Sequence, residues 1–421
     1  MLVNDLIRRH LLPRAKEFLQ VFPAVVVQGA RQVGKSTLAQ MLVTGRSHVS
    51  VSMDDIDVAE AARLDPRAFV SQAGSGTLVI DEVQRDPTLL LAVKSAIDSE
   101  RRPGRFIMTG SSDLLRLSRT PDSLAGRAVT VDLHGLSQGE LSERPDDFAA
   151  WVVHAWGTEA AKVRSSSWSR TDYVDALIRG GYPEVRNLPD RLRAAWFDSY
   201  LDRLLTRDVY DVSRGLFSDR LSGVLRLVAA NQGGELVPTR LADALSIPKS
   251  TINTYLAALA TLYLTNDLPP WGANLTKREI GRHKVAVADC GLAARLARLR
   301  ATALESLTAA TALGAQLEAF VAGELTKQRG WSAEEHDLYH FRDRNGLEVD
   351  LVIEYGDGRV FLIEVKASST YRSDHVRGIR QLADRLGDRF IGGAVLGLST
   401  EPLQLAQGIW GLPLSTLWEH S

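Results

Sequence analysis

Cysteine is nearly absent from this sequence: Cys290 is the single one among 421 residues. One cysteine cannot form an internal disulfide or a zinc site built from several thiolates, and such usage is typical of a reducing compartment. No run approaches 18 consecutive apolar residues, so we expect neither a membrane-spanning segment nor a membrane partner. The first residues mix acidic and basic side chains and lack a small-residue cleavage site, unlike a secretory signal. We therefore expect a cytoplasmic protein.

The sequence also has no excess of either charge, because its 50 Lys and Arg residues are balanced by 51 Asp and Glu residues. This balance excludes a uniformly basic coat for nucleic acid, although a local basic surface remains compatible with it. Apolar residues make up 45% of the chain and charged residues 24%, which excludes extensive disorder and a coiled-coil rod. The length exceeds what one core can bury, so we expect about two to four folded domains.

The first 140 residues alternate short apolar runs with helical patterns. Short strands that alternate with helices predict a parallel sheet covered on both faces, and therefore an α/β domain over residues 1–140. The predicted strands are residues 24–28, 49–53, 78–80, 106–108 and 129–133, and the predicted helices are residues 35–42, 57–64 and 88–97.

Three further regions are predicted after this domain. Residues 141–215 read as an insertion and a helical lid or connector, with a loop-rich stretch at 142–170. Residues 216–275 read as a winged helix-turn-helix, because leucine and isoleucine recur at helical spacing on both sides of a short turn. Its second helix would open with Lys249, Ser250, Thr251 and Asn253, and residues 262–268 would form the wing. Residues 280–421 read as an α/β domain.

A glycine-rich stretch reads GARQVGKST and matches G-x-x-x-x-G-K-[ST], between a predicted strand and a predicted helix. Successive backbone N–H groups and a helix N-terminus suit a polyphosphate. Lys35 would bring a positive charge to the β- and γ-phosphates, and the Ser36 hydroxyl would hold Mg²⁺. The predicted nucleotide-binding residues are Gly29, Ala30, Arg31, Gln32, Val33, Gly34, Lys35, Ser36 and Thr37.

Two carboxylates end an apolar strand 46 residues beyond Lys35. Asp81 is predicted to bind Mg²⁺ through water, and Glu82 is predicted to activate the attacking water as a general base. Such an acidic pair favours hydrolysis over nucleotide storage, and it disfavours a small-molecule kinase.

Two further residues are candidates for the hydrolytic reaction. Thr109, at the tip of the next strand, is predicted to contact the γ-phosphate or the water, with Ser111 as the weaker choice; an ordinary turn is the alternative. Arg127, just before the fifth strand, is a candidate arginine finger, and an ordinary ion pair is the alternative.

A second group of charged residues lies near the C-terminus. Asp350 falls in a predicted strand, and Glu364-Val365-Lys366 falls in another one 14 residues later. Residues two apart in a strand share a face, so Glu364 and Lys366 point the same way and converge with Asp350. Two carboxylates suit Mg²⁺ or Mn²⁺, and a lysine suits charge stabilisation, as phosphodiester hydrolysis requires. The alternative is a set of ion pairs in an inactive binding domain.

With its loop on the first strand, its Asp-Glu pair on the third and a polar residue on the fourth, the first domain resembles the AAA+ class of ATPases. The resemblance implies a sheet ordered 5-1-4-3-2 and ATP rather than GTP as the nucleotide. It also implies a homo-oligomer in which one subunit supplies an arginine to its neighbour.

The C-terminal pattern resembles the PD-(D/E)XK restriction-endonuclease-like superfamily, with Asp350, Glu364 and Lys366 at the motif positions. The resemblance implies that Glu318, on the first helix of that fold, is a metal ligand together with Asp350 and Glu364; Gln381 is a weaker candidate. Nearly the whole chain is similar to a prokaryotic family of AAA+ ATPases with a C-terminal domain of unknown function. The similarity rests on GARQVGKST, LVIDEVQ, TGSS, LAGR, GGYPE and FRDRNGLEVDLVIE…IEVKAS.

These features favour an ATP-driven switch or motor that acts on double-stranded DNA and carries a candidate metal-dependent nuclease. The competing hypothesis is an ATP-gated oligomeric scaffold whose helix-turn-helix packs internally and whose last domain binds a protein partner. Lys249, Arg240 and Lys277 form only a modest basic set, so the sequence leaves both hypotheses open.

Overall fold

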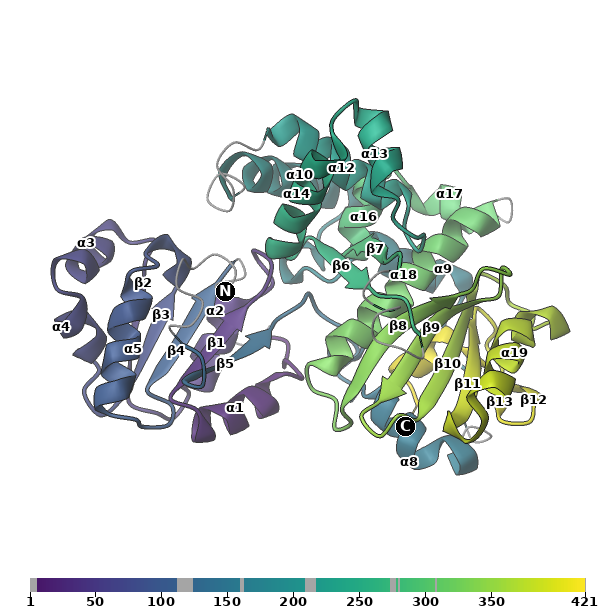
Figure 1. Cartoon of the computed structure of the whole chain (residues 1–421), viewed down its shortest axis with the longest axis horizontal. Helices are drawn as coiled ribbons and strands as arrows, with labels where there is room; N and C mark the ends of the chain where they lie inside the picture. The colour runs from purple at the N-terminus through teal and green to yellow at the C-terminus, as the bar shows by residue number, and fades with distance from the viewer. Residues whose placement is uncertain are drawn as a thin grey trace.

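The computed structural model describes residues 6–111, 124–159, 163–208, 217–272, 278, 281–306 and 309–420. Figure 1 shows an N-terminal sheet with its helices on the left, a helical middle body at the top and a C-terminal sheet on the right. None of the helices in the described ranges has the length and apolar character that crossing a bilayer requires.

The N-terminal sheet has five strands in the order β2-β3-β4-β1-β5, and every neighbouring pair is parallel. Read from the other edge, this is the predicted order 5-1-4-3-2, which is confirmed. The interior strand β1, between β4 and β5, is buried along its whole length, as its continuous apolar run requires in a sheet covered on both faces. The strands are β1 (Ala24–Gln28), β2 (His48–Ser52), β3 (Thr77–Asp81), β4 (Phe106–Gly110) and β5 (Ala128–Asp132).

Helices cover both faces of this sheet. Val25 and Val27 of β1 pack into a core with α1 and α2, whereas Ala24 and Val26 pack into a second core with α3, α4 and α5. This division follows from the alternation of side chains along a strand. The helices are α1 (Leu12–Val21), α2 (Lys35–Leu42), α3 (Ile56–Leu64), α4 (Pro66–Ser71) and α5 (Leu89–Ser99).

The middle body is mainly helical, and most of its helices share one core with α1 and α2. Its α9 and α17 instead pack into the core of the C-terminal sheet. The helix-turn-helix lies at α13 and α14, and Ser246 ends α13 in a left-handed conformation with φ 53°. The ribbon β6–β7 crosses the predicted boundary at 275–280, because Thr265 pairs with Val287. The elements are α9 (Arg170–Arg179), α10 (Asp190–Arg203), α12 (Ser218–Ala230), α13 (Pro238–Leu245), α14 (Lys249–Thr261), β6 (Thr265–Leu268), β7 (Lys284–Val287), α16 (Cys290–Leu296) and α17 (Ala301–Glu305).

The C-terminal sheet has six strands in the order β12-β13-β11-β10-β9-β8. Strand β10 is antiparallel to β9 and parallel to β11. Phe361 and Ile363 face a core with α18, whereas Val360 and Leu362 face α19 on the other side. The elements are α18 (Ala310–Arg329), β8 (His336–Arg342), β9 (Glu348–Tyr355), β10 (Val360–Lys366), α19 (Arg377–Leu386), β11 (Phe390–Gly397), β12 (Leu403–Ala406) and β13 (Ile409–Pro413).

The predicted loop-rich stretch at 142–170 is wrong in its middle, because α8 (Phe148–Glu159) forms there. Figure 1 shows α8 beneath the C-terminal sheet. Its Phe148 and Trp156 rings lie 6.0 and 4.6 Å from the ring of Phe361. The segment is apolar on most of its faces, so it lacks the periodic pattern by which a surface helix is recognised.

Candidate functional site

The glycine-rich loop connects β1 to α2 through unusual backbone conformations. A Cβ atom on Gly29 would lie 2.1 Å from the carbonyl oxygen of Leu133, so glycine is required there. Gln32 and Gly34 have φ values of 63° and 98°, in the left-handed region. Such a succession of turns directs backbone N–H groups into a concave anion site, and the α2 N-terminus adds its dipole.

Lys35 and Ser36 open α2 at this loop. Lys35 is 5% exposed, and its Nζ atom donates to the carbonyl oxygen of Ala30 at 2.9 Å. The Ser36 hydroxyl donates to the two carboxylate oxygens of Asp81 at 2.9 and 3.1 Å. A hydroxyl oxygen and a carboxylate oxygen side by side are the ligand types that Mg²⁺ takes, so the residues fit the predicted metal.

Thr109 connects the two acids that follow β3. Its buried hydroxyl donates to Asp81 Oδ1 and accepts the backbone N–H of Glu82 at 3.2 Å. Thr109 therefore fixes the orientation of Asp81 and Glu82. The Glu82 carboxylate accepts from Gln84 Nε2 and, at 3.3 Å, from the Ser111 hydroxyl. Sequence reasoning missed Gln84, although its place two residues after Glu82 was visible.

Arg127 lies at the amino end of β5, whereas the loop follows the carboxyl end of the parallel strand β1. Its guanidinium binds both carboxylate oxygens of Asp98 at 2.6 and 3.0 Å. This hydrogen bonding lowers the pKa of Asp98. Arg127 is therefore not part of the nucleotide site of its own chain, and a role toward a neighbouring copy stays a prediction.

A cavity of about 820 Å³ opens between the loop and the middle body. The loop residues and Glu82 line one wall, and one face of α10 lines the other. On that face the rings of Trp196 and Tyr200 are stacked 5.1 Å apart, and Arg203 lies one turn further on. Sequence reasoning described this segment only as a lid or connector, because nothing local marks which face of α10 would meet the loop.

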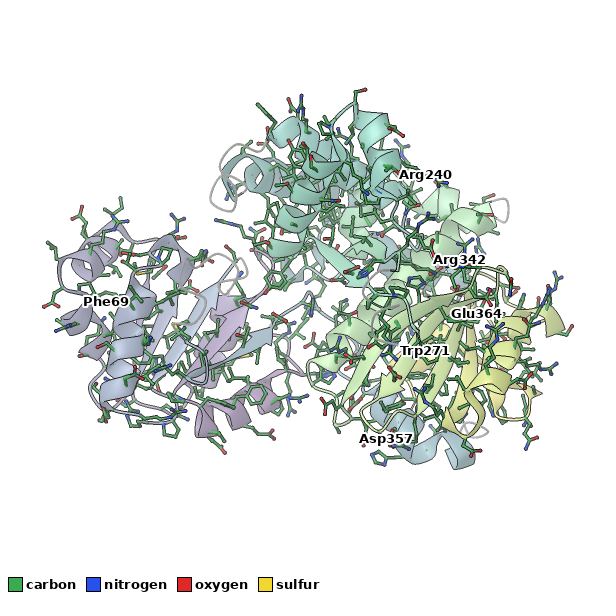
Figure 2. The ribbon with its side chains drawn as sticks, in the orientation of Figure 1. Phe69, Arg240, Trp271, Arg342, Asp357 and Glu364 are labelled. Carbon is green, nitrogen blue, oxygen red and sulfur yellow. The ribbon has the colours of Figure 1, made fainter. Side chains whose placement is uncertain are left out.

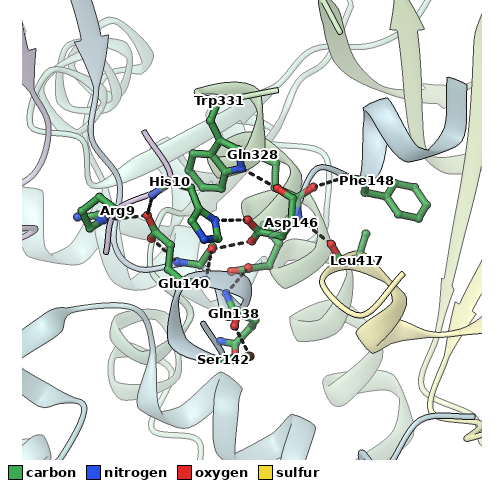
Figure 3. A network of polar contacts seen from close by, with 12 residues as sticks. Arg9, His10, Gln138, Glu140, Ser142, Asp146, Phe148, Gln328, Trp331 and Leu417 are labelled. Atoms are coloured by element: carbon green, nitrogen blue, oxygen red, sulfur yellow. Dashed lines mark hydrogen bonds and ion pairs between the residues drawn. The ribbon is translucent and has the colours of Figure 1, made fainter. Parts of the chain in front are cut away.

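Arg9 ties the glycine-rich loop to the rest of the chain, as Figure 3 shows in part. The buried guanidinium donates to the carbonyl oxygens of Val33 and His134, each at 2.8 Å, and to Glu140 Oε1 at 3.0 Å. Glu140 is buried too, and with Ser137 it forms the capping box of α7 (Gln138–Leu141). Sequence reasoning missed this cluster.

The polar contacts continue from α7 to α18. The backbone N–H of Gln138 donates to Glu324 Oε2 at 2.8 Å, and Lys327 Nζ donates to Glu324 Oε1 at 2.6 Å. In the same network, the Gln328 side chain accepts the N–H of Phe148 and donates to the carbonyl oxygen of Leu417 (Figure 3). The loop is thus connected by direct contacts to the helix that carries Glu318.

The predicted C-terminal residues lie close together on β9, β10 and α18. Asp350 Oδ2 accepts the N–H of Val365 at 2.8 Å, and Lys366 Nζ lies 2.6 Å from Glu364 Oε1 and 3.9 Å from Asp350 Oδ2. Burial and the nearby Asp350 charge raise the pKa values of Glu364 and of Glu318, each to about 8. In Figure 2, Glu364 lies near the upper end of this sheet, below Arg342.

Two residues that contact these carboxylates, Lys284 and Glu348, were not predicted from the sequence. Lys284 on β7 donates to Glu318 Oε1 at 2.6 Å and to Glu348 Oε1 at 3.1 Å. Burial lowers the pKa of the Lys284 ammonium, but the charges of Glu318 and Asp350 outweigh this effect and raise it. Glu348 was recognisable as the strand residue two before Asp350, whereas Lys284 comes from a different body.

The arrangement of these carboxylates does not fit a metal centre as it stands. Among the residues that the structure describes, no three His, Cys, Asp or Glu side chains are placed to share one metal ion. Gln381 lies exposed on α19. We call Glu318, Glu348, Asp350, Glu364 and their two lysine partners Lys284 and Lys366 the carboxylate cluster.

The helix-turn-helix presents polar residues to solvent. Lys249, Ser250 and Asn253 are exposed on α14, and Thr251 is half-buried. Arg240 is exposed on α13, where Figure 2 labels it at the top right. Lys277, the third member of the predicted basic set, lies outside the described residues.

Comparisons with known families agree with the N-terminal geometry. Residues 21–142 match the model described as AAA domain, and residues 170–303 and 313–417 match two described as domains of unknown function, DUF8612 and DUF4143. The N-terminal body is therefore a P-loop ATPase domain of the AAA type. The predicted class of this domain and the predicted C-terminal domain of unknown function are both confirmed.

Individual proteins are similar over most of the chain. Uncharacterized protein Rv2008c of Mycobacterium tuberculosis is 29% identical over 366 residues, which cover 86% of this chain and 74% of that protein. The Walker-type ATPase PABY2304 of Pyrococcus abyssi is 16% identical, with 70% and 97% of the two chains covered and a TM-score of 0.45. AMPPCP-bound DnaA from Aquifex aeolicus is 11% identical, with 60% and 86% covered and a TM-score of 0.29.

Proposed function

We propose that this protein is a Mg²⁺-dependent ATP hydrolase that works as an ATP-driven switch or motor on double-stranded DNA. One observation carries the hydrolysis: Ser36 contacts Asp81 at the glycine-rich loop, and Glu82 lines the same cavity as Lys35. These are the groups that bind a nucleoside triphosphate and activate water.

Each residue has a defined task in this proposal. Lys35 binds the β- and γ-phosphates, while Ser36 and Asp81 hold the metal. When bound, Mg²⁺ neutralises charge on the phosphate oxygens. Glu82 accepts the proton of the attacking water, and Gln84 keeps its carboxylate in place through the hydrogen bond to Oε2.

The cavity between two bodies supports the switch. Because the loop forms one wall and α10 the other, a nucleotide in this cavity contacts both bodies. Binding and hydrolysis then change the free energy with which the middle body holds the ATPase domain. We infer that homo-oligomers form in the ATP-bound state, with Arg127 as the candidate finger for the neighbouring subunit.

DNA contact is proposed for the winged helix-turn-helix of the middle body. The exposed start of α14, with Lys249, Ser250 and Asn253, supports it because recognition helices read DNA with their first residues. We further propose that the last domain has a restriction-endonuclease-like fold. Asp350, Glu364 and Glu318 would hold Mg²⁺ or Mn²⁺ for phosphodiester cleavage after a rearrangement, beside Lys366.

The experiment measures phosphate release from ATP with Mg²⁺, with and without linear, nicked or single-stranded DNA, and runs the same reactions on a gel. We expect turnover that DNA stimulates and a metal-dependent nick that Asp350→Ala removes. DNA affinity should fall as salt rises, because phosphate contacts release counterions. Absence of ATP turnover would refute the hydrolase, and absence of DNA affinity at low salt would refute the DNA role.

A second candidate function is an ATP-gated scaffold with an inactive C-terminal domain that binds a protein partner. The lysine partners of Glu318 and Glu364 favour it, because ion-paired acids are neutralised without a metal. Turnover that DNA leaves unchanged, together with intact DNA substrate, would select this function.

A further inference from the structure

The carboxylate cluster lies where the middle body meets the C-terminal sheet. Lys284 is 5% exposed and reaches Glu318 and Glu348 from the ribbon β6–β7. A Cβ atom on Gly233, in the connection between α12 and α13, would lie 3.1 Å from Glu318 Oε2. Two segments of the middle body therefore press against the same carboxylate.

The Lys284 ammonium contacts the oxygens that a metal ion would need. Its Nζ atom lies 2.6 Å from Glu318 Oε1 and 3.1 Å from Glu348 Oε1. A divalent ion at Glu318 would take its oxygens at about 2.0–2.1 Å for Mg²⁺. The ammonium and the ion would therefore compete for the same lone pairs, and their like charges would repel each other.

Lys366, the other lysine of the cluster, lies on the same strand as the carboxylate that it pairs with. Lys366 lies on β10, the strand that carries its partner Glu364, so the pair moves as one piece. Lys284 instead reaches Glu318 from β7, which pairs with β6, whereas α18 covers the C-terminal sheet. The ribbon β6–β7 is itself hydrogen-bonded to β8, because the N–H of His340 donates to the carbonyl oxygen of Pro269 at 3.0 Å and His340 Nε2 lies 3.0 Å from the carbonyl oxygen of Arg282. These contacts hold Lys284 in the cluster.

We propose that Lys284 is a built-in cation that excludes divalent metal from the carboxylate cluster by occupying the Glu318 and Glu348 oxygens. The inference rests on the metal site of the proposed function and specifies which side chain competes with the metal there. It also accounts for the lack of a ready three-ligand group among the described residues.

The test measures the binding of Mn²⁺ to the full chain in the absence of nucleotide. The electron paramagnetic resonance signal of free Mn²⁺ reports how much of the ion remains unbound. Lys284→Gln keeps a polar side chain but removes the charge, so we expect Mn²⁺ to bind about 10-fold more tightly than to the wild type. Lys284→Arg keeps the charge and should bind as the wild type does. Lys327→Gln, which removes another buried ammonium on the far part of α18, is the matched control and should show no gain.

The experiment distinguishes a failure of the role of Lys284 from a failure of the metal site itself. An unchanged affinity in Lys284→Gln, with Mn²⁺ still lost in Asp350→Asn, would overturn the role of Lys284 and keep the metal site. No Asp350-dependent binding in either chain would overturn the metal site and this inference together.

A second measurement needs no variant and guards against poor folding of Lys284→Gln. Acetylation of the wild-type chain, read by mass spectrometry, should label Lys284 faster when Mn²⁺ is added, while Lys327 stays protected. Equal labelling of Lys284 with and without Mn²⁺ would overturn the proposal.

Discussion

Acidic side chains at the nucleotide site and at the carboxylate cluster have different partners. At the nucleotide site, Asp81 accepts hydrogen bonds from the hydroxyls of Ser36 and Thr109. In the cluster, Glu318 and Glu364 are each paired with a lysine. A hydroxyl donor leaves the negative charge available to a metal ion, whereas an ammonium neutralises it. The carboxylate of Asp81 is therefore left without a cation in the described contacts, whereas Glu318 and Glu364 are each neutralised by a lysine.

The two regions also differ in how they are assembled. The nucleotide groups come from the carboxyl ends of neighbouring parallel strands, which meet at one edge of a sheet by construction. The cluster needs α18, two antiparallel strands and a ribbon from the middle body. A site made within one sheet is fixed once the sheet forms, whereas a site made by three pieces depends on how those pieces pack together.

The largest expected effect is at the nucleotide site, with Lys35→Ala, because this variant should impair the binding of ATP as well as its turnover. Because its ammonium is the single side-chain cation predicted for the β- and γ-phosphates, we expect ATP turnover to fall by about 100-fold or more. Phosphate release and binding of a fluorescent ATP analogue measure this. Lys94→Ala, on α5 and outside the cavity, is the control and should leave both unchanged. Equal turnover in the two variants would remove the glycine-rich loop from catalysis.

Glu82→Gln separates binding from hydrolysis. The amide keeps the shape of the side chain but cannot accept the proton, so we expect turnover to slow by about 10²–10⁴-fold while ATP still binds. Single-turnover hydrolysis and analogue binding measure the two quantities. Turnover at the wild-type rate would exclude Glu82 as the base.

Asp350→Ala and Lys366→Ala test whether the carboxylate cluster cleaves DNA. If the cluster cleaves DNA, both variants should lose metal-dependent nicking, because they remove a ligand and a charge-stabilising group. ATP turnover should stay within about twofold, since neither residue lies at the nucleotide cavity. Nicking that survives in both variants would assign the activity elsewhere.

The sequence motif located the glycine-rich loop between β1 and α2, because its residues are consecutive and have a fixed backbone geometry; the nucleotide-binding roles of these residues stay a prediction. The sheet order followed from a family resemblance and is confirmed. The convergence of Asp350 with Glu364 followed from strand periodicity alone. Lys284, Arg9 and the wall at Trp196 were not predictable in this way. Each is placed by packing between bodies, which leaves no periodic or spaced signal in the sequence.

Arg9→Lys should give the smallest effect and tests whether the two regions communicate. Lysine keeps the charge but cannot make the three contacts of the guanidinium to Val33, His134 and Glu140 at once. Loss of one such hydrogen bond costs about 1–2 kcal/mol, so we expect KM for ATP to rise by about 5- to 30-fold with a smaller change in kcat.

The matched control for Arg9→Lys is Arg14→Lys on α1, whose guanidinium donates to the carbonyl oxygen of Ser332 at 3.0 Å and leaves the glycine-rich loop alone. A loss of stability without a loop role would lower the melting temperature of both variants and raise KM in neither. A KM that rises only in Arg9→Lys identifies Arg9 as a residue that positions the loop. If nucleotide then protects α18 from hydrogen exchange in the wild type but not in Arg9→Lys, the contacts through Glu140 connect the nucleotide site to the helix that carries Glu318.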